Sequence, residues 1–393
     1  MFKISLILFF VVSVTFSTIY TPQAILPTLQ QVFQLSMSET NLLLFSMLFV
    51  LMVATPFYIP IIKRYDKKKI MSFSIFFLFL SVLLSALADN YYLLLFSRVL
   101  QGIFLPGFTA VMLSYVQEIY PENSRGLGIG IYMAATSFGA VLGRLLAGWI
   151  TYVYSWYIAF FVFASLLLVA LFALLFGLPS TKIDNTKTKQ IRSDKSIFYC
   201  FFQLEIISLL FIPMVVFFSF MSITTFITYR LHNIPFDFNE SQLGNIFLIL
   251  LVGVVVSPIA GKYSDILGRV KIIFIGIFSL IIGMILTTTD LNSVIIIGIG
   301  FVTIGMFSVQ SVAPAYLGDL VPHDKGRILL LYQIFFYFGG AMGTLAPTVV
   351  WSYYNYFGVI VLCLGVVILA ILPLIYLTFT KKYNKYEETN ILP

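Results

Sequence analysis

The strongest constraint on this chain is a series of long apolar runs that continues from one end to the other. A bilayer core of about 30 Å is crossed by a helix of about 20 apolar residues, and in lipid only helices or closed barrels satisfy every backbone polar group. The ten-residue alternation of barrel strands is not visible. Twelve runs have the required length: residues 5–28, 41–62, 70–88, 91–115, 127–149, 156–178, 206–229, 242–261, 271–289, 293–316, 328–350 and 357–379. We therefore predict an all-α membrane protein with twelve transmembrane helices.

The amino-acid composition also indicates a membrane protein. Hydrophobic residues make up 60% of the 393 residues and charged residues only 10%, with a mean hydropathy of +1.01, whereas a soluble domain is roughly one quarter charged. The net charge of +7 does not indicate a nucleic-acid partner, because the basic residues stand in short clusters between apolar runs. Cys200 and Cys363 have no neighbouring His or Cys, so we expect neither a metal site nor a disulfide framework.

The lysine and arginine clusters predict the orientation. With the first residue in the cytoplasm, all but three of the 23 Lys and Arg fall in cytoplasmic segments; the exceptions are Arg230 outside and Arg98 and Arg144 within runs. We expect a multi-pass protein of the cytoplasmic (inner) membrane with both termini cytoplasmic. The first run is interpreted as a retained span, because it has no clear small-residue cleavage site.

A polar segment divides the runs into two sets of six. It reads PSTKIDNTKTKQIRSDKS, and its charge and its Ser and Thr suit a flexible tether. The motif FGAVLG at 138–143 returns as FGGAMG at 338–343, and Asp319 follows Glu118 at a similar offset. Ordered matches of this kind indicate a duplicated unit. The predicted organisation is two pseudo-symmetric six-helix bundles, residues 1–178 and 206–380, with a cytoplasmic linker at 179–205 and a cytoplasmic tail at 381–393.

The fifth run combines glycines with an arginine. It reads GIYMAATSFGAVLGRLLAG and contains Gly130, Gly139, Gly143 and Gly148. Glycine is a poor helix former in water, but in lipid it lets helix backbones approach closely and slide; the alternative is ordinary small-residue packing with no moving part. Arg144 is costly in lipid, and it is either an anchor that reaches the interface or a group that binds a ligand.

Two further motifs lie in the fourth run and in the loop after the eighth. The fourth run contains LLFSRVLQG at 94–102, in which Arg98 lies deep enough to be a functional candidate, with snorkelling to the interface as the alternative. The loop reads GKYSDILGR and contains Gly261, Asp265, Gly268 and Arg269. Its glycines permit a tight turn, and its Asp and Arg can bind a helix end and a carboxylate.

These three motifs resemble those of major facilitator superfamily transporters, in the twelve-span drug:proton antiporter branch, and the resemblance covers essentially the whole chain. That branch has Gly-Pro and Gly-Gly pairs in span five; here Arg144 replaces the proline and Ala147 one glycine. The resemblance implies a major facilitator fold, a role for Arg98 in proton coupling, and a loop that latches the outward-open state. The first-half loop, IPIIKRYDKKK, departs from the pattern with Lys63 and Asp66, although Arg64 and Lys67 keep the charge. Only half of the usual latch pair is therefore carried over, with Arg64 as the gating candidate of this loop, and the alternative is a topology anchor.

The substrate cavity implied by the resemblance faces spans one, four, seven, ten and eleven. Its candidates are mostly aromatic or neutral polar, which suits amphipathic molecules: Tyr20, Gln23, Arg98, Gln101, Thr224, Thr225, Gln310, Tyr332, Gln333 and Tyr337. Interhelical packing is the alternative for any single Tyr or Gln. No Asp or Glu lies mid-membrane, so proton coupling, with Arg98 and Arg144 as candidates, is implied by the resemblance alone. Two embedded arginines without embedded acids favour an anionic or zwitterionic substrate.

The resemblance implies a secondary active transporter that works by alternating access, exporting small amphipathic organic molecules in exchange for protons. We expect a monomer without a cofactor, since the chain has no phosphate-binding loop. An importer or facilitative exporter of an anionic or zwitterionic metabolite stays open, because a fold does not determine a substrate. Other classes are a membrane-embedded lipid-modifying enzyme, for which two isolated histidines are too few, and a non-transporting sensor.

Overall fold

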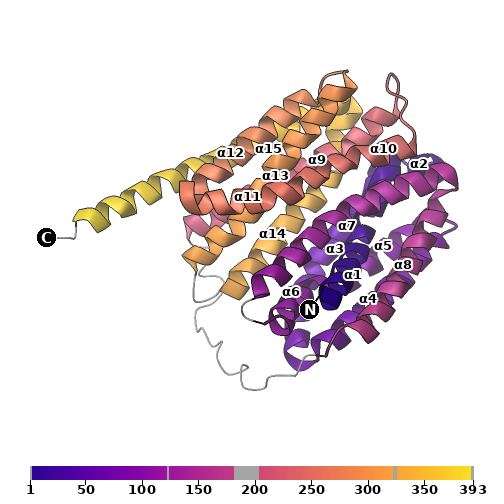
Figure 1. Cartoon of the computed structure of the whole chain (residues 1–393). Helices are drawn as coiled ribbons and strands as arrows, with labels where there is room; N and C mark the ends of the chain where they lie inside the picture. Colours follow the sequence, from indigo (N-terminus) through magenta and orange to yellow (C-terminus); the bar gives the residue numbers. More distant parts are fainter. Residues whose placement is uncertain (1, 122–123, 181–202, 322–324, 391–393) are drawn as a thin grey trace. The chain divides into compact units, whose positions relative to one another are not determined.

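The computed structural model describes residues 2–121, 124–180, 203–321 and 325–390, and every regular element in these ranges is a helix (Figure 1). The first elements are α1 (Phe2–Tyr20), η1 (Thr21–Ile25), α2 (Leu26–Val32), α3 (Met37–Arg64), α4 (Lys67–Ala86), α5 (Tyr91–Phe104), α6 (Pro106–Ile119), α7 (Arg125–Val153) and α8 (Trp156–Gly177). The remaining elements are α9 (Leu204–His232), α10 (Glu240–Ile246), η5 (Phe247–Leu251), α11 (Val252–Leu267), α12 (Arg269–Leu286), α13 (Asn292–Leu320), α14 (Lys325–Leu345) and α15 (Pro347–Asn390).

Three of the apolar runs are helices that change geometry at defined residues. The first run passes from α1 into the 3-10 helix η1 at Tyr20, where Pro22 supplies no backbone donor. α5 and α6 meet at Leu105, directly before Pro106, and η5 joins α10 to α11. With each of these combinations taken as one segment, the described ranges contain twelve helical segments long and apolar enough to cross a membrane. The predicted all-α class with twelve membrane helices is confirmed.

Polar residues between the runs determine where several helices begin. Ser36 and Glu39 form a capping box at the start of α3, and Asn239 and Gln242 form another at α10. Asn90 caps α5 in the same way with its side-chain oxygen. These side chains satisfy backbone donors that have no partner within the first turn of a helix.

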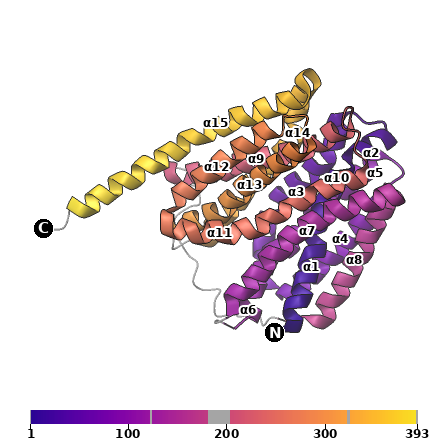
Figure 2. The same cartoon turned by 45° about the horizontal axis from the view of Figure 1, so that its top comes forward.

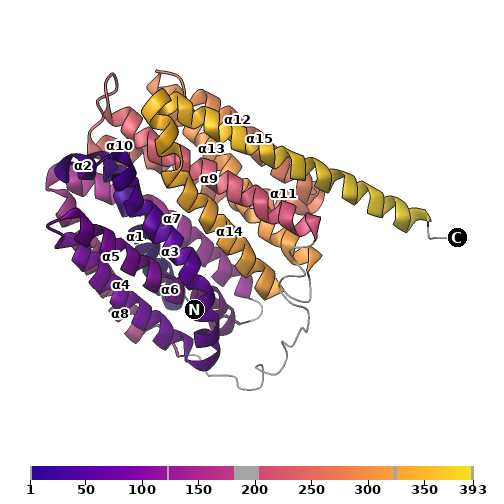
Figure 3. The same cartoon turned by 180° about the vertical axis from the view of Figure 1, so that it is seen from behind.

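The chain forms two compact units. Unit 1 consists of residues 1–191 and 224–254, and unit 2 of residues 192–223 and 255–393. In unit 1, α1 packs on α7 and α8, α4 packs on α8, and α10 packs on α7 (Figure 2). In unit 2, α12 packs on α13 and α15 (Figure 3). The predicted linker at 179–205 lies largely outside the described residues.

Candidate functional site

Glycines bring α7 into backbone contact with α1. A Cβ atom on Gly139 would collide with the carbonyl of Ser13, and one on Gly143 with the carbonyl of Ser17. The two glycines are one helical turn apart, so they form a single smooth face on which α1 lies. Ser13 also donates through Oγ to the Ala135 carbonyl at 3.1 Å. We call this contact, made by Ser13, Ser17, Gly139 and Gly143, the α1–α7 seam.

The other two glycines of the fifth span differ from this pair. A Cβ on Gly148 would collide with the Glu240 carbonyl and approach Gly244, both in α10. A Cβ on Gly130 would meet nothing within 4 Å. Close backbone approach therefore requires glycine at 139, 143 and 148, whereas packing makes no such demand at 130.

Arg98, on α5, is completely buried and hydrogen-bonds to backbone carbonyls at the C-terminal end of α1. Its Nε donates to the Leu43 carbonyl at 3.1 Å, its Nη1 to the Thr18 carbonyl at 3.1 Å, and its Nη2 to the Ile19 carbonyl at 2.8 Å. α1 ends directly after these residues, and a regular helix would have paired the Thr18 carbonyl with the N–H that Pro22 lacks. The guanidinium therefore replaces missing backbone donors at a helix break.

A chain of neutral polar groups continues from Arg98. Its Nη1 also donates to Gln101 Oε1, and Gln101 Nε2 donates to Ser85 Oγ at 2.9 Å. The hydroxyls of Ser85 and Ser97 lie 2.7 Å apart. Every nitrogen of the Arg98 guanidinium thus has an acceptor, so the snorkelling alternative does not apply and Arg98 acts as an internal brace between α5, α3 and α1.

Arg144, on α7, is 1% exposed and differs from Arg98 in its partners. Its Nε donates to Gln23 Oε1 at 2.7 Å and its Nη1 to the Ala140 carbonyl at 2.6 Å. The guanidinium carbon lies 4.0 Å from the ring centroid of Tyr20 and 5.0 Å from that of Phe247, within cation–π range. Its Nη2 is buried without a hydrogen-bond partner. Arg144 therefore holds a positive charge and an unpaired donor in a buried site.

Gln23 joins Arg144 to α9. While its Oε1 accepts from Arg144, its Nε2 donates to the hydroxyls of Thr224 at 3.0 Å and Thr225 at 2.9 Å. The side chains of Gln23, Thr224 and Thr225 are completely buried. The structure therefore divides the predicted polar candidates of unit 1 into two groups, one around Arg98 and Gln101 and one around Arg144.

Two of the predicted candidates of unit 2, Tyr332 and Tyr337, lie beside a second glycine contact. A Cβ on Gly339 would collide with the Met214 carbonyl, and one on Gly343 with the Phe218 carbonyl, so α14 meets α9 by the same means as α7 meets α1. We call this contact the α9–α14 seam. Ser222 Oγ donates across it to the Gly343 carbonyl at 2.9 Å.

Aromatic rings, rather than charges, lie beside the α9–α14 seam. Phe217 and Phe336 stack with centroids 4.0 Å apart, and Tyr332 stacks on Phe336 at 5.6 Å. Tyr337 meets Phe217 edge to face at 6.4 Å. Of the other two candidates, Gln333 is exposed and Gln310 is half-buried.

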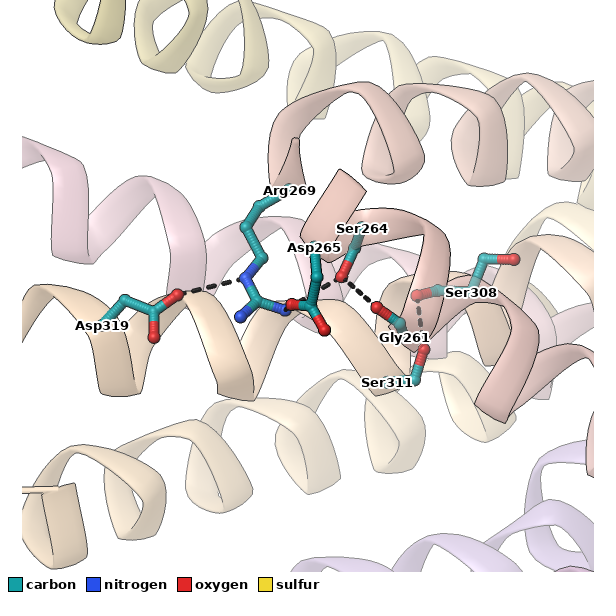
Figure 4. A network of polar contacts seen from close by, with 7 residues as sticks. All are labelled: Gly261, Ser264, Asp265, Arg269, Ser308, Ser311 and Asp319. Atoms are coloured by element: carbon teal, nitrogen blue, oxygen red, sulfur yellow. Dashed lines mark hydrogen bonds and ion pairs between the residues drawn. The ribbon is translucent and has the colours of Figure 1, made fainter. Parts of the chain in front are cut away.

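The loop between α11 and α12 is organised by Arg269 (Figure 4). Its Nη1 lies 2.9 Å from Asp265 Oδ1 and donates to Ser264 Oγ at 2.9 Å, and its Nε donates to Asp319 Oδ2 at 3.1 Å. Gly268 precedes α12 with φ at 96°, a backbone conformation available mainly to glycine. A Cβ on Gly261 would meet nothing within 4 Å, so packing does not require glycine there.

The corresponding loop between α3 and α4 makes an equivalent ion pair from different residues. Lys67 pairs with Glu118, and Asp66 caps α4 by accepting from the Lys69 N–H at 3.1 Å. Asp66 is at the position that Gly268 has in the second loop. Because its φ is an ordinary −58°, this position does not require glycine. Arg64, the predicted gating residue, is exposed at the end of α3.

Several residues that contact the predicted site or join its helices were not predicted from the sequence. Phe247 contacts the Arg144 guanidinium, Tyr229 donates to Asn41 Oδ1 at 3.0 Å, and Thr28 donates to Glu240 Oε1 at 2.8 Å. Phe247 is one of 41 phenylalanines, so its residue type carried no signal. For Asn41 and Glu240, the available signal was a polar residue at the edge of an apolar run.

The electrostatics of the site depend on carbonyl oxygens and rings. Across the ranges that the structure describes, neither Arg98 nor Arg144 forms an ion pair with a carboxylate, and no group of three His, Cys, Asp or Glu is placed to hold a metal ion. A buried charge is stable only when polar groups compensate it. Arg98 has this compensation in full, and Arg144 only in part.

Within the described ranges, twelve membrane-length helices, two glycine seams that repeat the same backbone contact, and an ion-paired loop at equivalent points of the two halves define a polytopic helical membrane protein with a repeated architecture. The chain belongs to the Major Facilitator Superfamily, whose profile matches residues 8–250 and again residues 209–391. It is a transporter and not an enzyme.

Bacterial relatives and solved structures agree with this assignment. An uncharacterized transporter of Buchnera aphidicola is 30% identical over 359 residues, covering 91% of this chain and 87% of the relative. The inner membrane transport protein YnfM of Escherichia coli is 25% identical over 361 residues, covering 91% and 86%. The crystal structure of a bacterial homolog to the human lysosomal transporter Spinster, inward-facing and unoccupied, has a TM-score of 0.75 at 16% identity and covers 95% of both chains, so it shows a shared fold.

Proposed function

We propose that this protein is a proton-coupled exporter of small amphipathic organic molecules, of the drug:proton antiporter branch, which works by alternating access. In this proposal it is a monomer of the bacterial inner membrane with both termini in the cytoplasm. The excess of Lys and Arg in the predicted cytoplasmic segments and the similarity to YnfM, an inner membrane transport protein of Escherichia coli, support that placement.

The α1–α7 seam is the observation that carries the proposal. The spacing of its glycines resembles the span-five pattern of the antiporter branch, and both glycines lie on the backbone of α1. A smooth seam without interlocking side chains lets two helices slide or bend against each other. Because α14 meets α9 through the same contact, each set of six spans contains one such seam, which agrees with a transporter built from two related halves.

The proposed substrate contacts supply the chemistry that amphipathic molecules need. In unit 1 they are polar and buried: Gln23, Thr224 and Thr225 beside Arg144, which is also near Tyr20. In unit 2 they are aromatic, with Tyr332 and Tyr337 beside Phe217 and Phe336. Buried polar anchors and aromatic stacking surfaces are each typical of contacts with small organic molecules.

Flux measurements in proteoliposomes test the proposal. With a pH gradient imposed, an exporter of this kind moves a labelled amphipathic substrate uphill, and the movement stops when the gradient is collapsed. Flux that runs only downhill at any pH difference contradicts proton exchange. Protein-free liposomes carrying the same gradient provide the control for passive partition of the substrate.

A second candidate is a facilitative exporter or importer of an anionic or zwitterionic metabolite. It is favoured by Arg144, which is 1% exposed and has a nitrogen without an acceptor and no carboxylate partner in the described ranges. The same experiment separates the candidates, because facilitated movement follows the substrate gradient and is indifferent to the proton gradient.

A further inference from the structure

We propose that the Arg144 guanidinium binds the carboxylate of the transported molecule, and that Gln23 occupies this position while no substrate is bound. The inference rests on the proposed transport function and names its substrate class, a small organic anion with an apolar or aromatic body. The donors and acceptors around Arg144 carry it.

The first step is the inventory of donors. A guanidinium has five N–H groups in a planar fork that matches the two oxygens of a carboxylate. At Arg144 the Nε and Nη1 nitrogens have acceptors and Nη2 has none, although Nη2 is buried. A buried donor without a partner costs roughly 1–3 kcal/mol, so this site is incomplete in the absence of a further acceptor.

The second step is the position of Gln23. Its Oε1 lies 2.7 Å from Arg144 Nε, on the edge of the guanidinium that Nε shares with Nη2. A carboxylate that binds this edge places one oxygen on Nη2 and the other where Gln23 Oε1 now lies. Gln23 then keeps the hydroxyls of Thr224 and Thr225 as partners. The neutral amide is thus a weaker substitute for a charged acceptor.

The third step is the surroundings. Tyr20 and Phe247 face the guanidinium with their rings, so its planar edge is the part left for a ligand. Among the described residues no carboxylate of the protein competes for Arg144. An anionic substrate is therefore the partner whose charge complements the site.

Arg98 shows that burial alone does not create this demand. It is equally buried, yet each of its three nitrogens has an acceptor, and two of these acceptors are the carbonyls of Thr18 and Ile19 at the end of α1. The hydrogen bonds of Arg98 fully account for its burial, whereas Nη2 of Arg144 has no acceptor within the described part of the protein.

The test measures anion binding by the purified full-length protein, using benzoate and 2-naphthoate as probes and benzamide and 2-naphthamide as their uncharged matches. Thermal unfolding in detergent is followed as a function of probe concentration, because a ligand that binds the native state raises the unfolding temperature. Variants are Arg144→Gln, Arg144→Lys and Gln23→Glu, with Lys271→Gln as a control that removes one exposed positive charge.

The inference predicts that a carboxylate probe stabilises the wild type and Lys271→Gln, and that its amide does not. Arg144→Gln weakens binding at least about tenfold, the loss expected for a charge-assisted hydrogen bond, and Arg144→Lys retains part of it. Gln23→Glu supplies a permanent carboxylate to Arg144, so this variant unfolds at a higher temperature and no longer responds to the probes.

Three outcomes overturn the inference: equal responses of wild type and Arg144→Gln, equal responses to carboxylates and amides, or no response of the wild type to either carboxylate. Flux of benzoate into proteoliposomes separates it from the transport proposal. Binding through Arg144 without movement keeps the site and refutes transport of this probe. Movement that Arg144→Gln leaves unchanged keeps transport and refutes the site.

Discussion

The α1–α7 seam and the α9–α14 seam have the same backbone contact and different chemistry. In both, two glycines four residues apart lie on the carbonyls of two residues that are also four apart. The residue after the second glycine is Arg144 in unit 1 and Thr344 in unit 2, where the threonine only bonds back to the Ala341 carbonyl at 2.7 Å. Duplication has therefore kept the helix packing, which depends on backbone shape, and has let the side chains next to it diverge.

The first helices of the two seams also differ. α9 continues from Leu204 to His232, whereas α1 stops at Tyr20 and gives way to η1. The break in α1 exposes carbonyls that Arg98 satisfies. Glu118 and Asp319 occupy equivalent positions in the two halves, and the same sequence offset pairs Arg98 with Ile299. Ile299 is 1% exposed. A buried arginine thus stands in the half whose helix is broken, and an apolar residue in the half whose helix is intact.

The largest expected effect comes from removing this brace. Arg98→Leu removes the donor to the carbonyls of Thr18 and Ile19 at the break in α1 and a further hydrogen bond to the Leu43 carbonyl, at a cost of about 3 kcal/mol. We expect a strong loss of folded protein, measured by size-exclusion chromatography and thermal unfolding in detergent. Arg98→Lys recovers only part, because an ammonium group lacks the planar fork. A stable Arg98→Leu variant contradicts the role of Arg98 at the break.

The next effect compares the seams directly. Gly143→Ala and Gly343→Ala each force a Cβ into a backbone carbonyl, and overpacking of this kind costs about 1–3 kcal/mol. We expect both variants to unfold at similarly lowered temperatures. Gly130→Ala, in open space, serves as the matched control and leaves the unfolding temperature unchanged or slightly raised. Unequal losses at 143 and 343 mean that the two seams are not equivalent.

A smaller difference is expected between the two helix starts that follow the ion-paired loops. Gly268→Asp forces a side chain into a conformation with φ at 96°, which costs roughly 1–3 kcal/mol. Asp66→Gly removes only the side-chain cap of α4, and replacing a capping Asp by Gly lowers the free energy of unfolding by only about a few tenths of a kcal/mol. Thermal unfolding of the two single variants measures the contrast, and an equal response at both positions refutes the backbone explanation for their different residues.

The smallest effect on stability is expected from the ion pairs themselves. Glu118 and Asp319 are both more than one third exposed, so Lys67→Ala and Arg269→Ala each cost about 1 kcal/mol or less, and added salt reduces the difference from wild type. Arg269→Ala has the larger effect, because it also loses Ser264 and Asp265. Unfolding temperatures at low and high salt check this order; a larger loss for Lys67→Ala reverses it.

The sequence was sufficient for the fold because membrane helices depend on local properties. Apolar length, Lys and Arg clusters and the FGAVLG and FGGAMG repeat are all visible without knowing any contact. The helix caps at Ser36, Asn90 and Asn239 also depend on local sequence, since each capping side chain bonds within the first turn of its own helix.

The site needed the tertiary structure, and Arg98 and Arg144 show why. In the sequence both are arginines within apolar runs, with the same two interpretations open to each. Their roles differ because Arg98 meets carbonyls at the end of a helix 79 residues away, while Arg144 meets one amide 121 residues away and keeps one nitrogen unpaired. Similarly, Lys67 rather than Arg64 reaches Glu118, which only the packing of α4 and α6 decides.

By itself, the sequence determined that this protein is a membrane protein of twelve helices with a repeated motif, because hydrophobic length and repetition are properties of the chain alone; its transporter class followed from the likeness of its motifs and sequence to a known family. Only the tertiary structure decided which glycines are backbone contacts, which arginine is a brace and which is left with a free donor. The physical reason is that a buried polar group is defined by the partners that satisfy it, and these partners come from distant parts of the chain.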